Sequence, residues 1–388
     1  MLCISPRALL RLMAGVMSGF ALLCSAGWGE PPSSSPKVVS SLWQKHVPAQ
    51  LTGLDLSRDG RVVAFTAAPL AANGDSHLHV YDLMGRELWT ALRKLKILGV
   101  SLSDDGQYAS IGMMDASVAL FAKDGTLLWE HQSVGLPYIT PQGRNVVALN
   151  SGISGPANPL LEVFRRDGHK VWSLRRQGRI WRAITSDLSD LLVGLWNREV
   201  LLIDRQHRIT WQKVLPQEIM ALAMSPEDAQ YLAIGAGVLD PVVHFYERGG
   251  RLMWQRKVPL GVTELSLARQ GNFLLSYGNT IHGQHLALYS HAGEVEWTYH
   301  LDTPATESSK AVIVPQSPLI VAGIERHHQY YLQGFTLAGT PLWMAPVPVP
   351  IFDFRVSHDG RYLAAATDHS LYFFDTQLSA TQKAEIQK

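Results

Sequence analysis

The chain has 388 residues, of which 46% are hydrophobic and 17% charged. It is therefore long enough for a large core and poor in charge for a protein in water. The net charge of +1 excludes a general electrostatic attraction to nucleic acid, so no nucleic-acid partner is expected.

The first 26 residues have the pattern of a secretory signal peptide. Arg7 and Arg11 form a positive start, the run 12–24 is apolar, and residues 24–26 (CSA) are small where a signal peptidase reads the chain. We expect cleavage before Gly27 and a periplasmic or secreted protein. The alternative is an uncleaved membrane anchor, for which the apolar run is short. The chain is therefore not expected to be integral to the membrane.

Both cysteines, Cys3 and Cys24, fall inside this segment. The mature chain would then have no disulfide, no thiolate metal ligand and no cysteine nucleophile. Lipid attachment at Cys24 is not expected, because Leu23 stands where a lipoprotein signal has a small residue. Residues 27–37, rich in proline and serine, are typical of a flexible linker.

Tryptophan reveals an internal repeat of 39 to 46 residues. From the second copy on, each tryptophan closes a similar phrase, such as YDLMGRELW, FAKDGTLLW or FTLAGTPLW. Each phrase predicts two short strands joined by a polar turn that usually contains glycine. We interpret these tryptophans as structural residues that pack one repeat on the next. They are Trp43, Trp89, Trp129, Trp172, Trp211, Trp254, Trp297 and Trp343.

A second hairpin precedes each tryptophan phrase. Residues 54–68, 100–114 and 354–368 each place Asp-Gly between two apolar runs, which is a strong hairpin signal. Each repeat therefore has four strands, named A to D. No helical periodicity competes with this pattern after the linker.

Four antiparallel strands repeated at this period predict a β-propeller, because one blade cannot bury its own two faces. The last repeat, 351–379, has strands A to C and no tryptophan strand, whereas residues 41–48 (SLWQKHVP) form a tryptophan strand with no repeat before it. We expect residues 41–48 to complete the last blade and close the ring, which removes an exposed sheet edge. The fold class is an all-β, single eight-bladed propeller over residues 38–378, followed by a tail at 379–388.

The tryptophan phrase resembles the motif of eight-bladed quinoprotein-like propellers, and the resemblance covers the whole mature chain. The turns SRDG, SDDG and SHDG are similar to those of WD40-type repeats, although no Trp-Asp dipeptide occurs. The quinoprotein family includes dehydrogenases that use pyrroloquinoline quinone (PQQ) and the propeller lipoprotein of outer-membrane assembly. The resemblance implies the fold, not the quinone, because this chain lacks the vicinal cysteine pair and the long catalytic insertions of the dehydrogenases. It is closer to the lipoprotein.

Catalytic signals are weak, and we expect neither a catalytic residue nor a cofactor. Histidines occur in HGQH (282–285) and in RHHQYY (326–331), which belong to neighbouring repeats. His327 and His328 are therefore candidate binding residues. Together with His282 and His285 they could approach one metal ion, or they could be polar loop residues. No metal site is assigned to them.

One face of the ring is expected to carry the functional residues. The B–C and D–A connections share it, and they include the long loops 68–77, 150–159, 276–285 and 300–309. The same connections carry basic residues, which are either recognition residues or ordinary solvated charges. The candidates are Arg175, Arg176, Arg179, Arg256 and Lys257.

Two further tryptophans, Trp181 and Trp196, break the repeat in the fourth blade. If the strands pair as read, both lie near one rim, beside the arginines of LRRQGR (174–179). Aromatic and arginine side chains together are typical of interaction sites. Packing under a loop is the alternative.

The sequence thus favours an exported, non-enzymatic propeller that binds another envelope protein or an anionic envelope component. A quinoprotein-like oxidoreductase and a purely structural repeat subunit are the alternatives. The identity of the partner and the oligomeric state do not follow from the sequence.

Overall fold

The computed structural model describes residues 36–69, 73–152, 158–176, 178–186, 190–259, 261–280, 283–301 and 310–377. The expected signal peptide, residues 27–35 of the expected linker and the expected tail lie outside this part of the chain. The described residues form 33 strands and one 3-10 helix, η1 (Arg269–Gly271). No helix among them is long and apolar enough to cross a membrane.

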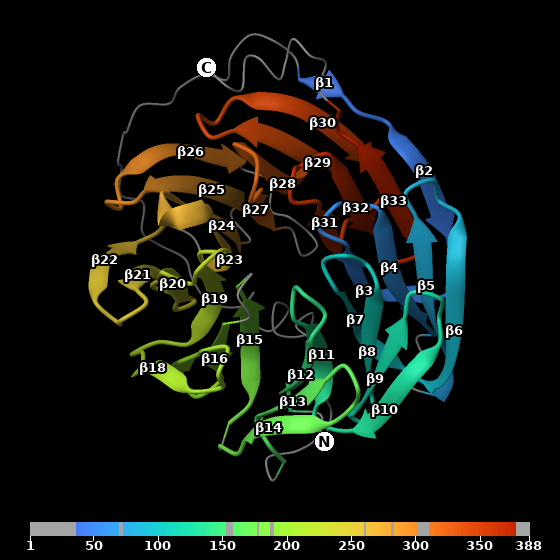
Figure 1. Ribbon diagram of the computed structural model, residues 1–388. Coiled ribbons are helices and arrows are strands. Elements are labelled where there is room, and N and C mark those ends of the chain that lie inside the picture. Colours follow the sequence, from blue (N-terminus) through green and yellow to red (C-terminus); the bar gives the residue numbers. More distant parts are fainter. Residues whose placement is uncertain are drawn as a thin grey trace. The chain divides into compact units, whose positions relative to one another are not determined.

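Eight sheets stand as blades around one axis (Figure 1), each with four antiparallel strands in the order A to D from the centre outward. This confirms the all-β, eight-bladed propeller. Blade 1 consists of β3 (Gln50–Leu56), β4 (Val62–Ala68), β5 (Asn73–Asp82) and β6 (Glu87–Leu95), and blade 2 of β7 (Ile97–Leu102), β8 (Tyr108–Met113), β9 (Ser117–Ala122) and β10 (Leu127–Gln132). Blade 3 consists of β11 (Gly135–Ile139), β12 (Asn145–Asn150), β13 (Leu161–Arg165) and β14 (Lys170–Leu174), and blade 4 of β15 (Ile180–Thr185), β16 (Leu191–Leu195), β17 (Glu199–Ile203) and β18 (Ile209–Val214).

The remaining blades follow the same plan, apart from the origin of one strand. Blade 5 consists of β19 (Ile219–Met224), β20 (Tyr231–Ala236), β21 (Val242–Glu247) and β22 (Leu252–Lys257), and blade 6 of β23 (Val262–Leu267), β24 (Phe273–Thr280), β25 (Gly283–Ser290) and β26 (Val295–Leu301). Blade 7 consists of β27 (Ala311–Ile313), β28 (Leu319–Arg326), β29 (Gln329–Thr336) and β30 (Pro341–Val347). Blade 8 consists of β31 (Asp353–Val356), β32 (Tyr362–Ala366), β33 (Ser370–Asp375) and, from the N-terminal part of the chain, β2 (Ser41–His46).

The A–B turns are held by the side chains that the sequence repeats. In blade 1 the Ser57 hydroxyl donates to the Asp59 carboxylate (2.8 Å) and accepts from the backbone N–H of Val62 (2.9 Å). Gly60 has a φ of 73° and lies against the ring of Tyr362 in blade 8, where a Cβ would come within 2.6 Å. Glycine is required there for both reasons. The Ser and Asp contacts recur in the turns 103–106 and 357–360.

The repeated tryptophans lie on outer strands and face the C–D turn of the next blade. The Trp43 indole N–H donates to the Leu83 carbonyl (3.0 Å), and a Cβ on Gly85 would lie 2.8 Å from the Trp43 ring. The left-handed glycine of the turn thus gives the indole a flat surface to lie on. The same contact joins Trp89 to Gly125, Trp129 to Gly168, Trp211 to Gly250, Trp254 to Gly293 and Trp297 to Gly339.

One blade replaces the glycine by an aromatic ring. In blade 4 the turn residue is His207, at a φ of 65°, and its imidazole stacks on Trp172 with ring centroids 5.3 Å apart. Burial lowers the pKa of His207, although Asp204 acts in the opposite direction. The indole of blade 3 therefore keeps its place although the sequence of the turn has changed.

Ring closure follows the expected route. The β2 strand pairs antiparallel with β33, which puts Trp43 opposite Phe373, and the two rings stack with centroids 4.9 Å apart. A buried apolar cluster then joins Phe65 of blade 1 to Leu371 and Phe373 of blade 8. The core is divided in this way into layers that lie between neighbouring blades.

A fifth strand on blade 7 was not expected from the sequence. Residues Lys37–Val38 form β1, which pairs parallel with β30. The pairing continues through the Val39 N–H, which donates to the Met344 carbonyl (2.8 Å). Trp343, opposite Lys37, is fully buried. Blade 8 has no C–D turn to cover this indole, because its D strand comes from the other end of the chain.

The A–B turns of consecutive blades are linked by main-chain hydrogen bonds near the axis. The bonds run from Gln316 N–H to the His358 carbonyl (2.9 Å), from His358 to Arg58 (2.9 Å), from Arg58 to Asp104 (2.8 Å) and from Asp104 to Pro141 (3.1 Å). The row ends at Pro141, which has no N–H. We call it the turn belt. It ties blades 7, 8, 1, 2 and 3 together without using a side chain.

We expect Trp43→Ala to lower the free energy of unfolding by about 3 kcal/mol, because it removes a buried aromatic contact and an indole hydrogen bond from the strand that closes the ring. Urea unfolding followed by circular dichroism measures the change. The matched change Trp196→Ala, on an exposed ring, should cost less than about 1 kcal/mol. Equal losses in the two variants would contradict the closing role of Trp43.

Candidate functional site

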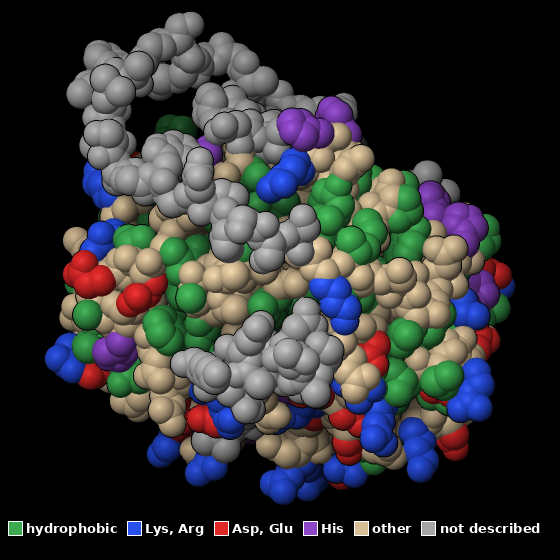
Figure 2. Space-filling model, turned by 90° about the horizontal axis from the view of Figure 1, so that it is seen from above, with side chains coloured by type: hydrophobic (Ala, Val, Ile, Leu, Met, Phe, Trp, Pro, Cys, Tyr) green, Lys and Arg blue, Asp and Glu red, His purple; other side chains and the backbone are tan. Residues whose placement is uncertain are grey.

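Antiparallel strands alternate in direction, so the B–C turns and D–A connections lie on one face of the ring and the A–B and C–D turns on the other. We call these the BC/DA face and the AB/CD face. Figure 2 views the ring from its rim, where Lys, Arg, Asp and Glu side chains gather toward one face and His side chains toward the other. On this side of the ring the two edges therefore differ in the kind of side chain that they carry.

The two off-repeat tryptophans lie together on the BC/DA face. Trp181 is on β15 and Trp196 in the turn between β16 and β17, and their rings meet edge to face with centroids 4.3 Å apart. The Trp196 N–H donates to the Arg179 carbonyl (3.1 Å), and the Arg182 guanidinium lies 5.3 Å from the Trp181 ring centroid. Trp196 remains 53% exposed. The pair is thus fixed at its base and open to solvent.

The three arginines that precede the pair have different surroundings. Arg176 is paired with Glu199, whose side chain is almost buried, and it also donates to the Gln212 side-chain carbonyl (3.3 Å). Arg176 is thus committed to holding blade 4 together, because its loss would leave a buried carboxylate unpaired. The Arg179 side chain lies against Gly152.

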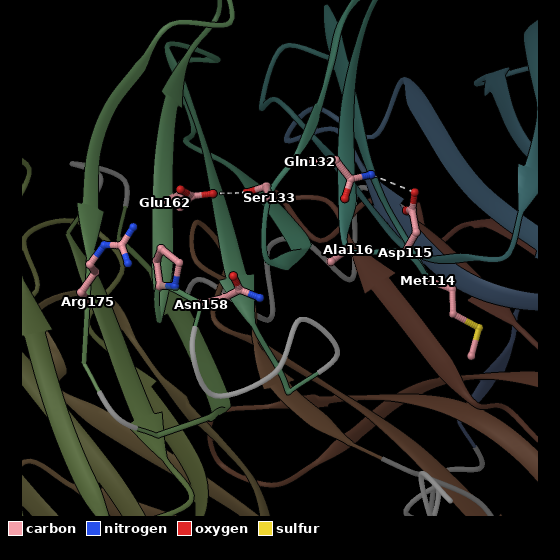
Figure 3. Close-up of a pocket in the computed structure, with 9 residues that line it drawn as sticks. Met114, Asp115, Ala116, Gln132, Ser133, Asn158, Glu162 and Arg175 are labelled. Carbon is pink, nitrogen blue, oxygen red and sulfur yellow. Dashed lines mark hydrogen bonds between the residues drawn. The ribbon is translucent and has the colours of Figure 1, made fainter. Parts of the chain in front are cut away.

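Arg175 lines a polar cavity of about 530 Å³ between blades 2 and 3 (Figure 3). In its wall the Ser133 hydroxyl donates to Glu162 (2.7 Å), and the Gln132 amide donates to Asp115 (3.0 Å). These contacts already engage both carboxylates. The cavity opens on the BC/DA face, and no sequence motif indicated it.

Three loops of blades 4 and 5 form one continuous surface on this face. The Leu215 N–H donates to the Arg198 carbonyl (2.9 Å), and the Arg198 guanidinium donates to the Pro216 carbonyl (2.9 Å). The Gln217 amide then donates to the Asp240 carbonyl (3.0 Å). The turn after β16, the loop after β18 and the loop after β20 are therefore held side by side.

This surface exposes large apolar side chains, and we name it the blade 4–5 patch. Its members are Trp196 (53% exposed), Val214 (61%), Val238 (44%) and Leu239 (87%). Contiguous exposed apolar groups of this kind mark interaction sites. The three aliphatic residues were not among the expected site residues, because those were chosen for charge and aromatic rings. The signal for Val238 and Leu239 was an apolar residue at a loop position, where a polar one is usual, and Val214 is the exposed last residue of β18.

Basic side chains are frequent on the loops of blades 3 to 5. Five of them make no ion pair with any described residue, and the exposed acids on the three loops that form the patch are Glu218 and Asp240. Of the other candidates, Lys257 pairs with Asp240 (2.9 Å) and Arg256 lies 3.9 Å from Glu294. The five cations are Arg175, Arg179, Arg182, Arg198 and Lys213.

The candidate histidines do not come together as a metal centre. His327 and His328 form the exposed tip of the β28–β29 hairpin, with φ values of 52° and 62°. His285 instead faces His300 across β25 and β26, with ring centroids 6.2 Å apart. His282 lies outside the described residues. Among the described residues no group of three or more His, Cys, Asp or Glu could hold a metal ion.

Near the axis, charged side chains of the inner strands neutralise one another. Asp353 bonds Lys310 (2.6 Å) and Arg355 (2.8 Å), and Arg355 lies 3.4 Å from Asp55. Burial raises the pKa of Asp55, whereas for Asp353 the cations outweigh burial and hold the pKa below its usual value. Burial likewise raises the pKa of Glu264. The network joins blades 7, 8 and 1 and leaves no charge excess of its own.

The fold and the face together define the class of the molecule, an eight-bladed β-propeller. No protein-family model and no curated protein match the chain. Among solved structures, BamB from Moraxella catarrhalis is 16% identical with a TM-score of 0.61, over 87% of this chain and 100% of that chain.

Two further propellers are similar. Sqt1 from Chaetomium thermophilum, solved bound to the N-terminus of ribosomal protein L10, is 11% identical with a TM-score of 0.70, over 88% of this chain and 100% of that chain. A chain of the mitotic checkpoint complex is 16% identical with a TM-score of 0.55, over 93% of this chain and 99% of that chain. At these identities the similarity establishes the fold alone.

His285 gives the stability a defined dependence on pH. Burial lowers the pKa of His285 to about 4, and His300 acts in the same direction. Below about pH 6.5 this histidine binds a proton in the unfolded chain but stays neutral in the folded chain. The free energy of unfolding therefore falls as the pH drops from about 6.5 toward 4. We expect His285→Leu to remove up to about 2 kcal/mol of the loss between pH 7 and pH 5.

Urea unfolding at a series of pH values measures this effect. His328→Leu, an exposed histidine changed in the same way, is the control and should keep the wild-type dependence. A wild-type dependence in His285→Leu would show that His285 does not resist protonation in the folded state.

Proposed function

We propose that the protein is an exported, non-enzymatic scaffold that binds a partner protein in the cell envelope through the blade 4–5 patch. The observation that carries this proposal is the set of apolar side chains exposed on three hydrogen-bonded loops. Fixed loops with exposed tryptophan and aliphatic groups can bury area on association at little cost in conformational entropy. Two similar propellers were solved in assemblies with other proteins, which supports the same use here.

The charges around the patch define the partner further. Arg179, Arg198 and Lys213, which make no ion pair with any described residue, favour acidic residues on the opposing surface, and this attraction raises the rate of association. Apolar side chains at the centre favour a protein over a purely anionic envelope component. The partner surface is thus an apolar segment flanked by Asp or Glu.

The quinoprotein alternative has a direct test. Dye reduction after addition of PQQ and Ca²⁺ to the purified protein would favour the oxidoreductase and count against a scaffold.

Export rests on residues 1–26, which lie outside the described residues. Fusion of residues 1–45 to a periplasmic reporter should give an exported product cleaved before Gly27, as N-terminal sequencing would show. An Arg7→Glu/Arg11→Glu fusion is the control and should stay in the cytoplasm, because the positive n-region is lost. Palmitate labelling at Cys24 would instead identify a lipoprotein.

The patch can be tested by site-specific photo-crosslinking in the native cell. A benzophenone amino acid at Trp196 or Leu239 should yield one discrete crosslinked product. The same probe at Met84 or Arg205, which are exposed on the AB/CD face, should yield none of it. Leu239→Asp should weaken the product at position 196 at least tenfold, because a carboxylate opposes both the apolar contact and the acidic partner.

Crosslinking from the AB/CD positions alone would place the interface on the AB/CD face and contradict the proposal. Thermal unfolding of Leu239→Asp should match the wild type, because the side chain is 87% exposed.

A further inference from the structure

Two exposed histidines meet where the ends of the chain close the ring. His46 is the last residue of β2, and His369 lies in the turn between β32 and β33. His46 stands opposite Ser370 in the register, and the two imidazole centroids are 6.3 Å apart. One ring thus comes from the N-terminal strand and the other from the last blade.

Hydrogen bonds orient both rings and fix the tautomer of one. His369 Nδ1 lies 3.1 Å from the Ala49 carbonyl, which can only accept, so Nδ1 carries the proton and Nε2 keeps its lone pair. His46 Nδ1 lies 3.2 Å from the Ser370 hydroxyl. No described residue bonds Nε2 of either ring. An Nδ1–H held by an oxygen, with a free Nε2, is the arrangement of a metal-ligating histidine.

We propose that His46 and His369 bind one divalent transition-metal ion through their Nε2 atoms, with Zn²⁺, Ni²⁺ or Cu²⁺ as the class of ligand. Imidazole nitrogen suits these ions. With metal–nitrogen bonds of about 2.1 Å, two imidazoles on one ion have centroids about 5 to 6.5 Å apart, depending on the bond angle. The observed 6.3 Å lies at the upper end of this range and needs a wide nitrogen–metal–nitrogen angle, which suits opposite ligands of square-planar or octahedral Ni²⁺ or Cu²⁺ better than tetrahedral Zn²⁺. Water completes the coordination, so the ion is exchangeable.

The position of the site gives the ion a role in closure. It would bridge β2 to the β32–β33 turn, across the seam where pairing of β2 with β33 closes the ring. Binding only to the closed ring multiplies the folding equilibrium constant by about 100 at a free metal concentration of about 100 times Kd. The metal would thus strengthen ring closure. This inference does not depend on the proposed partner.

The test is calorimetric titration of tag-free, EDTA-treated and desalted protein with Zn²⁺ or Ni²⁺, together with thermal unfolding. We expect one ion per chain and a rise in the unfolding midpoint. His46→Ala and His369→Ala should each weaken binding at least tenfold and abolish the rise in the midpoint. The double variant His327→Ala/His328→Ala, which removes the other exposed histidine pair of the same face, should behave as wild type.

Absence of binding would overturn the proposal, as would wild-type affinity in either seam variant. Loss of binding in the His327→Ala/His328→Ala variant alone would place the ion at the hairpin tip instead. The His369→Ala change also removes the hydrogen bond to the Ala49 carbonyl and could disturb the β32–β33 turn. The His46→Ala change keeps this bond, so a loss of binding in that variant reports the loss of the imidazole alone.

Discussion

Each blade of this protein has two apolar faces, and a four-stranded sheet can cover neither by itself. Every face must therefore be covered by a neighbouring blade, so the first and last blades must also cover each other. The chain meets this constraint by bringing β2 from its beginning to the outside of its last blade, where Trp43 stacks on Phe373 and lies on Gly85 of blade 1. The buried layer between blades 8 and 1 exists only because this strand arrives.

The repeated turn contacts that stabilise the ring and the exposed side chains that are candidates for binding lie on different faces. On the AB/CD face the turns are occupied by Ser–Asp hydrogen bonds, indole contacts and the turn belt. On the BC/DA face the loops carry exposed apolar groups, cations that pair with no described acid, and the seam histidines. Changes to the exposed side chains of the patch can thus alter binding with little effect on the ring, whereas changes to Arg176 or Glu199 would affect both.

The fold could be predicted because its determinants are local and repeated. The tryptophan spacing, the Asp-Gly turns and the incomplete first and last repeats together led to eight blades and the closing strand. The β1 strand could not be predicted, because it has only two residues and belongs to no repeat. The contact of Trp181 with Trp196 followed from the strand register. The ion pair of Arg176 with Glu199 did not, because periodicity carries no information about which charges meet.

The turn belt has a consequence for how such a chain can change in length. Its bonds join main-chain atoms only, and blades 8, 1 and 2 each supply both a donor and an acceptor. Blades 1 to 6 likewise each carry one indole that lies on the next C–D turn and one turn that receives the preceding indole. Duplication of a gene segment that encodes one repeat would therefore copy a complete set of complementary contacts, and a ring of different size would need no new kind of interface. The seam formed by β2 and β33 is then the element that must be inherited unchanged, because it joins the two ends of the chain within the last blade.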